Sequence, residues 1–171
     1  MFVQPGARLG ALRPATLRAR ARRLLAALRR GPWELNVVLC GDVEMRRLNR
    51  THRGADRPTD VLAFPMGSAR ALGDVVLDTD AVRRQARDRG GWARAHAAAR
   101  PGAGWDALAE ATMLLVHGVL HLCGHDHHRP ADARRMLRRE RALFAQLHRG
   151  DGSRSRSRSR SRRASAGDGY R

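Results

Sequence analysis

The stretch ATMLLVHGVLHLCGHDH, residues 111–127, decides the fold because it joins an apolar helix pattern to a cluster of histidines. Its apolar residues, with those just before them, predict a buried helix over residues 105–123. Gly124 follows directly, and glycine commonly occupies the left-handed position after a helix. We therefore expect a central helix that ends in a sharp turn, with histidines on both sides of the turn.

His117 and His121 lie four residues apart, so both imidazoles project from one face of this helix and can bind the same metal ion. Beyond the turn, the residues alone leave His125, His127 and His128 as alternatives for a third ligand. Three histidines suit zinc and leave one coordination position for water, which is the arrangement of a catalytic site. The spacing therefore predicts one Zn²⁺ ion at this helix.

Gly118 stands where His-Glu-x-x-His metallopeptidases carry the glutamate that serves as general base. Two interpretations of this glycine remain open. It either opens space beside the metal or lets the helix pack closely against a strand. In both cases the missing glutamate argues against peptide hydrolysis.

The chain around this stretch alternates helix and strand patterns. Residues 33–40, 59–64 and 73–78 are rich in strand formers and bounded by turn residues. Residues 16–30, 43–50, 79–87 and 131–147 have helical spacing of their apolar positions. We predict an α/β (α+β) fold, with a small mixed sheet of about four strands flanked by helices and the metal-binding helix at its centre.

We expect one domain over residues 1–149, with a flexible insertion at 88–104, where Gly, Ala and Arg follow no stable period. The Ser/Arg-rich tail, residues 150–171, has too few apolar residues to order itself and is predicted to be disordered. The two cysteines predict no disulfide, and no apolar run approaches the roughly 18 residues of a membrane span. We expect a cytoplasmic protein, or one in an organelle matrix if the Arg-rich N-terminus is a transit segment.

A formal net charge of +18 attracts polyanions, of which nucleic acid is the obvious one. The chain contains no lysine, however, so its arginine excess also fits biased coding. Charge alone therefore does not decide for a nucleic-acid partner.

The motif at residues 117–127 resembles the His-Gly-x-Leu-His-Leu-x-Gly-Tyr-Asp-His signature of the YbeY endoribonucleases, which are rRNA maturation factors. Two further blocks resemble the same family in the right order: Leu48-Asn49 through Arg53 with DRPTDVLAFP at residues 56–65, and LGDV at residues 72–75. The resemblance covers about residues 33–147. The chain departs from it at three positions, with His125 and His52 in place of tyrosines and Ala63 in place of a serine.

The resemblance implies that His117, His121 and His127 are the metal ligands and that Arg53 is the functionally important arginine. It also implies cleavage of single-stranded RNA, small-subunit rRNA end maturation, ribosome quality control and ribosome association. A guanidinium can hold a phosphate through two hydrogen bonds, so we expect Arg53 to stabilise the transition state. Without the resemblance, a surface ion pair between Arg53 and Asp56 would be the preferred interpretation.

No residue of the signature is an evident general base, so we expect zinc-bound hydroxide, or a water or ribose hydroxyl activated nearby, to attack the phosphate. Two other functions remain open. One is a zinc metallopeptidase, suggested by the helical histidine pair. The other is a ribosome-associated factor whose zinc mainly organises the fold.

Overall fold

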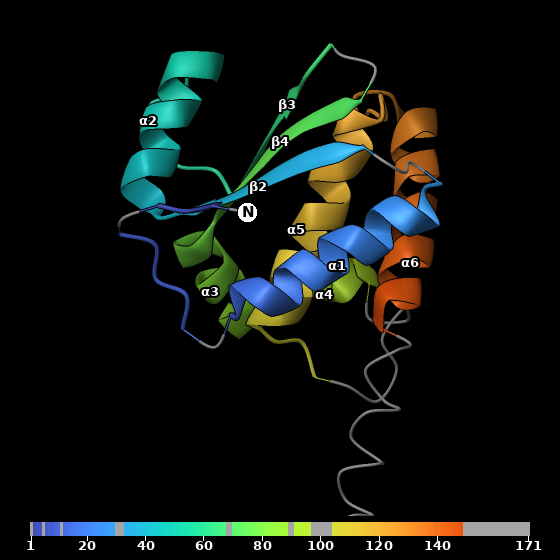
Figure 1. The fold of residues 1–171 in the computed structure, drawn as a ribbon, viewed down its shortest axis with the longest axis horizontal. Coiled ribbons are helices and arrows are strands. Elements are labelled where there is room, and N and C mark those ends of the chain that lie inside the picture. Colours follow the sequence, from blue (N-terminus) through green and yellow to red (C-terminus); the bar gives the residue numbers. More distant parts are fainter. Residues whose placement is uncertain are drawn as a thin grey trace, which may run out of the picture.

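The computed structural model describes residues 2–4, 6–10, 12–29, 33–67, 70–88, 91–96 and 104–148. Figure 1 shows the arrangement of the elements in these residues. In chain order the elements are β1 (Phe2–Val3), α1 (Pro14–Ala27), β2 (Glu34–Cys40), α2 (Asp42–Arg53), β3 (Val61–Pro65), β4 (Ala71–Asp78), α3 (Thr79–Asp88), α4 (Gly91–His96), α5 (Ala107–Leu122) and α6 (Pro130–His148).

The four strands form one mixed sheet in the order β1-β2-β4-β3. β2 runs parallel to both β1 and β4, whereas β3 runs antiparallel to β4. This sheet confirms the predicted fold class. The strand β1 was not predicted, and its two residues pair with Val38 and Leu39 of β2.

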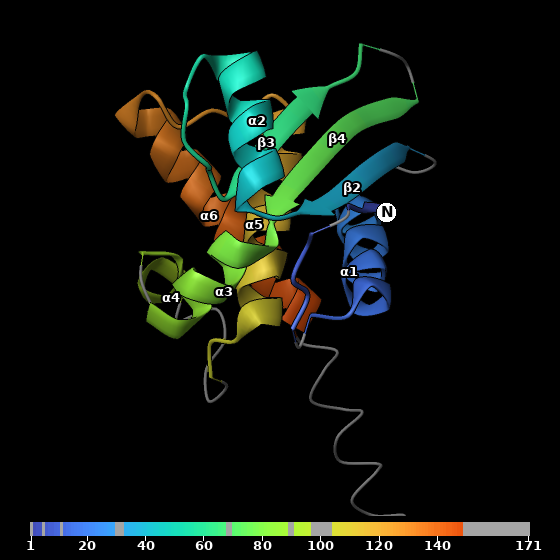
Figure 2. The same ribbon diagram turned by 90° about the vertical axis from the view of Figure 1, so that its left-hand side faces the viewer.

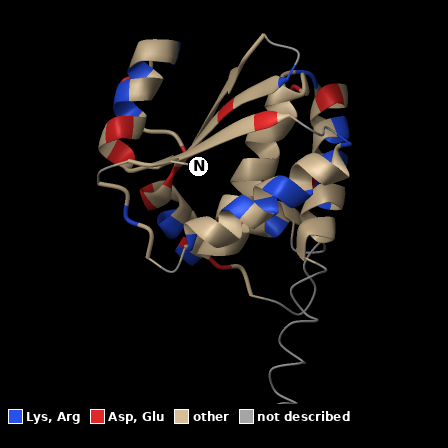
Figure 3. Ribbon diagram, in the orientation of Figure 1, with Lys and Arg blue, Asp and Glu red and all other residues tan. Residues whose placement is uncertain are grey.

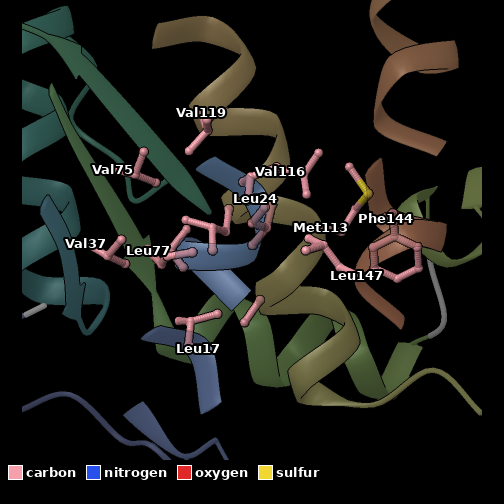
Figure 4. Packing of buried hydrophobic residues seen from close by; sticks show 14 of the residues in the cluster. Leu17, Leu24, Val37, Val75, Leu77, Met113, Val116, Val119, Phe144 and Leu147 are labelled. Atoms are coloured by element: carbon pink, nitrogen blue, oxygen red, sulfur yellow. The ribbon is translucent and has the colours of Figure 1, made fainter. Parts of the chain in front are cut away.

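The two faces of the sheet are buried against different helices, as Figures 1 and 2 show. Val75 and Leu77 of β4 belong to the main core, which α1, α5 and α6 complete. Val76, between them, faces the other way and packs with Met45 of α2. This alternation is the two-residue period of a strand buried on both faces. Figure 4 shows the main core, in which Phe144 of α6 is fully buried.

Helix α5 lies at the centre of the fold, and twelve of its sixteen residues are buried. Asp106 caps its first turn by accepting a hydrogen bond from the N–H of Ala109 at 2.8 Å. At its other end, Gly124 has a φ of 82°, and its N–H donates to the carbonyl of His121 at 2.9 Å. The N–H of His125 donates to the carbonyl of Leu120 at 3.0 Å, which completes a Schellman motif. The predicted turn at Gly124 is therefore present, with the left-handed conformation expected of it.

The structure differs from the prediction in three places. Helix α2 extends to Arg53, three residues beyond the predicted end, and Gly54 ends it in a left-handed conformation. Helix α1 ends at Ala27, before the predicted end at residue 30. Within residues 88–104, expected to be a flexible insertion, Gly91–His96 forms helix α4, with Ala93 and His96 buried.

The predicted tail, residues 150–171, lies outside the described residues, as do residue 149 and residues 89–90 and 97–103 of the predicted insertion. Cys40 is a buried free thiol, and Cys123 is a free thiol of intermediate exposure. In the part of the chain that the structure describes, every helix is too short or too polar to cross a membrane.

Candidate metal centre

The three histidines predicted as metal ligands come together at the end of α5. Each of His117, His121 and His127 offers a ring nitrogen, and these nitrogens all lie within 4.8 Å of one another. The Nε2 atoms of His117 and His121 face each other at 3.1 Å. His127 approaches from the loop beyond Gly124, with its ring centroid 5.0 Å from that of His121. Among the described histidines, this group includes neither His125 nor His128, so the geometry favours His127 as the third ligand.

The electrostatics of the site favour a neutral imidazole at His121. Burial, together with the neighbouring rings of His117 and His127, lowers the pKa of His121. A neutral imidazole keeps a lone pair that can bind a metal ion. Three converging imidazole nitrogens are a donor set that suits zinc. The residues present therefore fit the metal that the spacing predicted.

Glu140 of α6 contacts the ring nitrogen of His117 that faces away from the other two histidines. Its Oε1 lies 2.8 Å from Nδ1 of His117, which leaves Nε2 of that ring directed at the other two histidines. Burial by itself would raise the pKa of Glu140, but the adjacent His117 and His96 lower this pKa to about 2. The carboxylate is therefore ionised, as in the carboxylate–histidine pairs that orient metal ligands in other proteins.

His96 of α4 occupies the other side of the same carboxylate. Its ring is fully buried, and its Nε2 lies 3.5 Å from Oε2 of Glu140, close enough for electrostatic attraction but without hydrogen-bond alignment. The other ring nitrogen, Nδ1, lies 3.1 Å from the carbonyl oxygen of Trp92. Helix α4 thus contributes a buried imidazole to the support of His117, in a segment for which the sequence predicted no chemistry.

Arg53 lies in the same cleft as the histidines. This cleft has a volume of about 670 Å³, and its wall is formed by Arg53, Thr59, Asp60, Val61, Ala63, His117, Gly118, His121, Asp126, His127 and His128. Asp56, the alternative partner considered for Arg53, instead accepts two hydrogen bonds from Arg46, at 2.6 and 2.9 Å, and lies 3.8 Å from Arg50. In the described part of the chain, no acid lies within 4.0 Å of the Arg53 guanidinium. Its charge is therefore available to a ligand in the cleft.

Gly118 lets α5 approach the sheet closely. A Cβ atom at this position would lie 2.9 Å from Cγ1 of Val75 and 3.2 Å from Cγ2 of Val61. The first distance is one that real Cβ atoms essentially never show and the second is tight, so a larger residue would force the helix or the two valine side chains to shift. The structure thus supports close packing as the reason for this glycine, and it leaves no room for the glutamate of the metallopeptidase motif.

Asp126 shapes the loop that carries the third ligand. Its Oδ1 accepts the backbone N–H groups of His127 at 2.6 Å and of His128 at 3.3 Å. These bonds are those of an Asx turn, in which a short carboxylate side chain fixes the residues that follow it. Asp126 therefore orients His127 through its backbone.

A second group of potential ligands consists of Asp42, Asp78 and Asp80, whose carboxylate oxygens lie within 4.8 Å of one another. Oδ1 of Asp78 accepts the backbone N–H groups of Asp80 at 2.8 Å and of Ala81 at 3.2 Å, at the start of α3. Asp42 accepts two hydrogen bonds from Arg84, at 2.7 and 2.8 Å. The protein's own donors already engage these acids.

Known proteins share this arrangement of elements and motifs. A family model described as Endoribonuclease YbeY matches residues 12–148. This chain belongs to the YbeY endoribonuclease family. The resemblance drawn from the motifs is therefore confirmed.

Several relatives named Endoribonuclease YbeY are similar to the chain over most of its length. One from Anaeromyxobacter sp. (strain Fw109-5) is 46% identical over 80% of this chain and 64% of its own length. Another from Geobacter sulfurreducens is 40% identical over 78% of this chain and 86% of its own. The chain thus spans a little under two thirds of the first relative and most of the second.

The solution structure of TM1509 from Thermotoga maritima is similar to the fold. It has a TM-score of 0.60 and 24% sequence identity, over 90% of this chain and 91% of that chain. At this identity the likeness shows a shared fold.

Sequence reasoning about this YbeY family member missed two contributors to the site. Glu140 had a readable signal, because it falls on the apolar side of α6 between Met136 and Leu143, where an acid needs a buried partner. His96 had no comparable signal, because its segment follows no stable period. Asp60, from the block at residues 56–65 that resembles the family, also lies in the cleft wall.

Proposed function

We propose that the chain is a zinc-dependent endoribonuclease that cleaves single-stranded RNA at the cleft formed by His117, His121, His127 and Arg53. The observation that carries this proposal is the convergence of three ring nitrogens and an arginine without an acidic partner in one cleft. Its family, named for endoribonuclease activity, supplies the substrate class. An endoribonuclease is a hydrolase that acts on RNA.

When bound, zinc supplies a water whose pKa is lowered toward about 7 and a Lewis acid for a phosphoryl oxygen. His117, His121 and His127 would hold the ion, and Glu140 keeps the proton of His117 on Nδ1 so that Nε2 is free to bind. Arg53 binds the phosphate and offsets the negative charge that develops as the attacking oxygen approaches. The cleft wall also contains the carboxylates of Asp60, which accepts hydrogen bonds from Thr59 and Gln85, and of Asp126, which accepts the backbone N–H groups of His127 and His128. Carboxylates of this kind can accept a proton.

The size of the cleft favours a single strand. A volume of about 670 Å³ is that of a small-molecule pocket, which accommodates an unstacked nucleotide with its flanking phosphates. Bases of single-stranded loops and ends can be splayed out in this way, whereas those of a duplex remain stacked. We further propose that the RNA is ribosomal, at the end of the small-subunit rRNA, and that cleavage takes place in the cytoplasm during ribosome maturation and quality control.

The other two functions have less support. A metallopeptidase of the helical-histidine type needs a glutamate where the closely packed Gly118 stands. A mainly structural zinc is disfavoured because the hydrophobic core is continuous from the sheet through α1, α5 and α6 without the three histidines. Removal of the metal is therefore expected to abolish RNA cleavage and to leave the fold intact.

The test compares substrates and metal states of the purified protein. The zinc content is measured by mass spectrometry, and cleavage of a single-stranded RNA is compared with that of its duplex and of a peptide library. We expect one zinc ion per chain and cleavage of the single strand only. Cleavage of peptide but not RNA would identify a peptidase, and loss of the far-UV circular dichroism signal on chelation would identify a structural zinc.

A further inference from the structure

The arginines of this protein differ in whether they have an acidic partner. On α2 and α3, arginines pair with acids on or next to the same helices: Arg46 with Asp56 at 2.6 Å, Arg47 with Glu44 at 2.7 Å, Arg84 with Asp42 at 2.7 Å and Arg83 with Asp80 at 3.3 Å. Figure 3 shows both colours of charge on these two helices. Their positive charge is therefore largely balanced locally.

Helices α1 and α6 carry arginines without such balance. α1 contains no acid, and α6 contains two. Of those two, Asp132 pairs with Arg135, and Glu140 is buried against His117 and His96. Figure 3 shows the positive charge along both helices. We call the following exposed residues the α1–α6 arginine surface: Arg18, Arg22, Arg23, Arg134, Arg138 and Arg139.

In the described ranges, none of these six guanidinium groups has a carboxylate within 4.0 Å. Arg23 donates to the backbone carbonyl of Gln146 at 3.1 Å, which ties α1 to α6 but leaves its positive charge uncompensated. Leu24 of α1 and Leu147 of α6 lie in the same core below. The two helices therefore present their arginines on one rigid surface.

This surface begins beside the candidate cleft. α6 starts at Pro130, two residues after His128, which lies in the cleft wall. With 19 residues, α6 is about 28 Å long. Arg134, Arg138 and Arg139 lie in its first half, nearer the cleft, and Arg23 of α1 contacts Gln146 near its other end. A strand leaving the cleft along α6 would meet a series of guanidinium groups, each able to hold a phosphate.

We propose that the α1–α6 arginine surface binds the phosphate backbone of the RNA strand outside the cleavage cleft. This proposal rests on the proposed endoribonuclease function for the identity of the polyanion. An anionic membrane is the less suitable partner, because interfacial helices insert large apolar side chains next to their basic ones. The exposed large hydrophobic residues of the described chain all lie outside α1 and α6: Phe2, Val3, Val43 and Met66.

The test uses two variants that lose the same charge. The first carries Arg134→Gln, Arg138→Gln and Arg139→Gln on the α1–α6 arginine surface. The matched control carries Arg46→Gln, Arg47→Gln and Arg83→Gln on the balanced side. Glutamine and arginine have similar helix propensity, and circular dichroism melting checks that both variants fold. The Kd of the zinc-loaded protein for a long single-stranded RNA is measured by fluorescence anisotropy over a range of salt concentrations.

We expect the first variant to bind at least about tenfold more weakly and its slope of log Kd against log salt to fall by about 2, because each lost phosphate contact on a single strand contributes roughly 0.7. The control is expected to change the Kd by less than about twofold, as ordinary surface substitutions do. Equal weakening in both variants would show that only net charge matters and would overturn the proposal.

Cleavage separates this proposal from the proposed function. For the first variant we expect a raised KM on the long RNA and an unchanged kcat/KM on a tetranucleotide too short to leave the cleft. If the wild-type protein cleaved no RNA but the binding difference between the variants remained, the nuclease function would fail and the binding surface would stand. If the first variant instead lost binding to phosphatidylserine vesicles and kept its RNA affinity, the partner would be a membrane and the proposal would be wrong.

Discussion

The two groups of potential metal ligands lie at the two ends of α2. Asp42 begins this helix beside Asp78 and Asp80, and Arg53 ends it in the cleft of the three histidines. The acids already accept hydrogen bonds from backbone N–H groups and from arginines, whereas the two helical histidines face each other through their Nε2 atoms. Close approach of ligand atoms is thus common to both groups. The acids differ from the histidines in that most of their oxygens are already engaged, with Oδ2 of Asp78 the buried exception.

The largest expected difference between the groups concerns His117 and Asp80. His117→Ala removes a ligand, so zinc should no longer bind stoichiometrically, and RNA cleavage should fall by more than the 10–100-fold typical of residues that merely support a ligand. Asp80→Asn should leave both unchanged. Metal analysis and RNA cleavage assays on the two variants check this. Loss of zinc from Asp80→Asn, or stoichiometric zinc with full activity in His117→Ala, would contradict the assignment of the metal site to the histidines.

Arg53 and Arg84 lie near opposite ends of α2, one beside the histidines and the other beside the acids. Replacing each tests which end of the helix takes part in RNA cleavage. Arg53→Glu should leave zinc bound and lower RNA cleavage by about a hundredfold or more, the size seen when one donor to a developing charge is removed. Arg84→Gln, which affects only the pairing with Asp42, should leave cleavage within about twofold. Equal losses of activity in the two variants would show that Arg53 has no direct role in RNA cleavage.

A substitution of Glu140 tests whether zinc binding by the histidines depends on the carboxylate that accepts a hydrogen bond from His117. Glu140→Gln keeps an oxygen that can accept from His117 but removes the charge, and zinc affinity should fall by roughly 10–100-fold. Competition with a fluorescent zinc chelator measures this affinity without relying on activity. A thermal melt of the metal-free variant is the control for its fold. An unchanged zinc affinity would show that packing alone orients His117.

The smallest effect on activity is expected at Asp78, where the prediction concerns folding stability. The pKa of Asp78 is raised to about 7, first by burial and then by the neighbouring Asp42 carboxylate. Its Oδ2 is buried and has no hydrogen-bond partner in the described chain, which favours the protonated form. Because the folded pKa lies above the unfolded value, the stability this group contributes is complete below about pH 4 and is lost as the pH rises toward about 7.

The corresponding measurement is thermal unfolding across that pH range. The stability of Asp78→Asn relative to the wild-type protein should rise by roughly 3 kcal/mol between about pH 4 and pH 7, because each unit of pKa shift is worth about 1.4 kcal/mol. Asp42→Asn should reduce the same pH dependence, because it removes the neighbouring charge. A pH-independent difference between Asp78→Asn and the wild-type protein would contradict the raised pKa.

Periodic segments and local turn chemistry were predictable from the sequence. The helix of residues 105–123 and the turn at Gly124 could be predicted because apolar spacing and a left-handed glycine are local properties. β1 could not be predicted, since Phe2 and Val3 become a strand only by pairing with β2. The end of α2 at Arg53 had a signal in Gly54, a glycine directly after helix-compatible residues.

The site was predictable to a similar degree. Spacing gave the pair His117 and His121, and the family resemblance supplied His127. Close packing at Gly118 could not be decided, because it depends on Val75 and Val61, which are distant in sequence. The contact of His96 with Glu140 joins α4 to α6 and is likewise a product of tertiary structure.

The Schellman motif at Gly124 divides the ligands into two of fixed position and one on an exposed loop. His117 and His121 belong to a largely buried helix, whereas His127 is exposed and lies beyond the turn. His127 is therefore the ligand that can release an ion without any disturbance of the buried helix. On this view, the helical pair sets most of the zinc affinity, and the turn sets the rate of exchange. Replacing Gly124 by alanine should then change how fast a chelator removes zinc more than how tightly zinc is held.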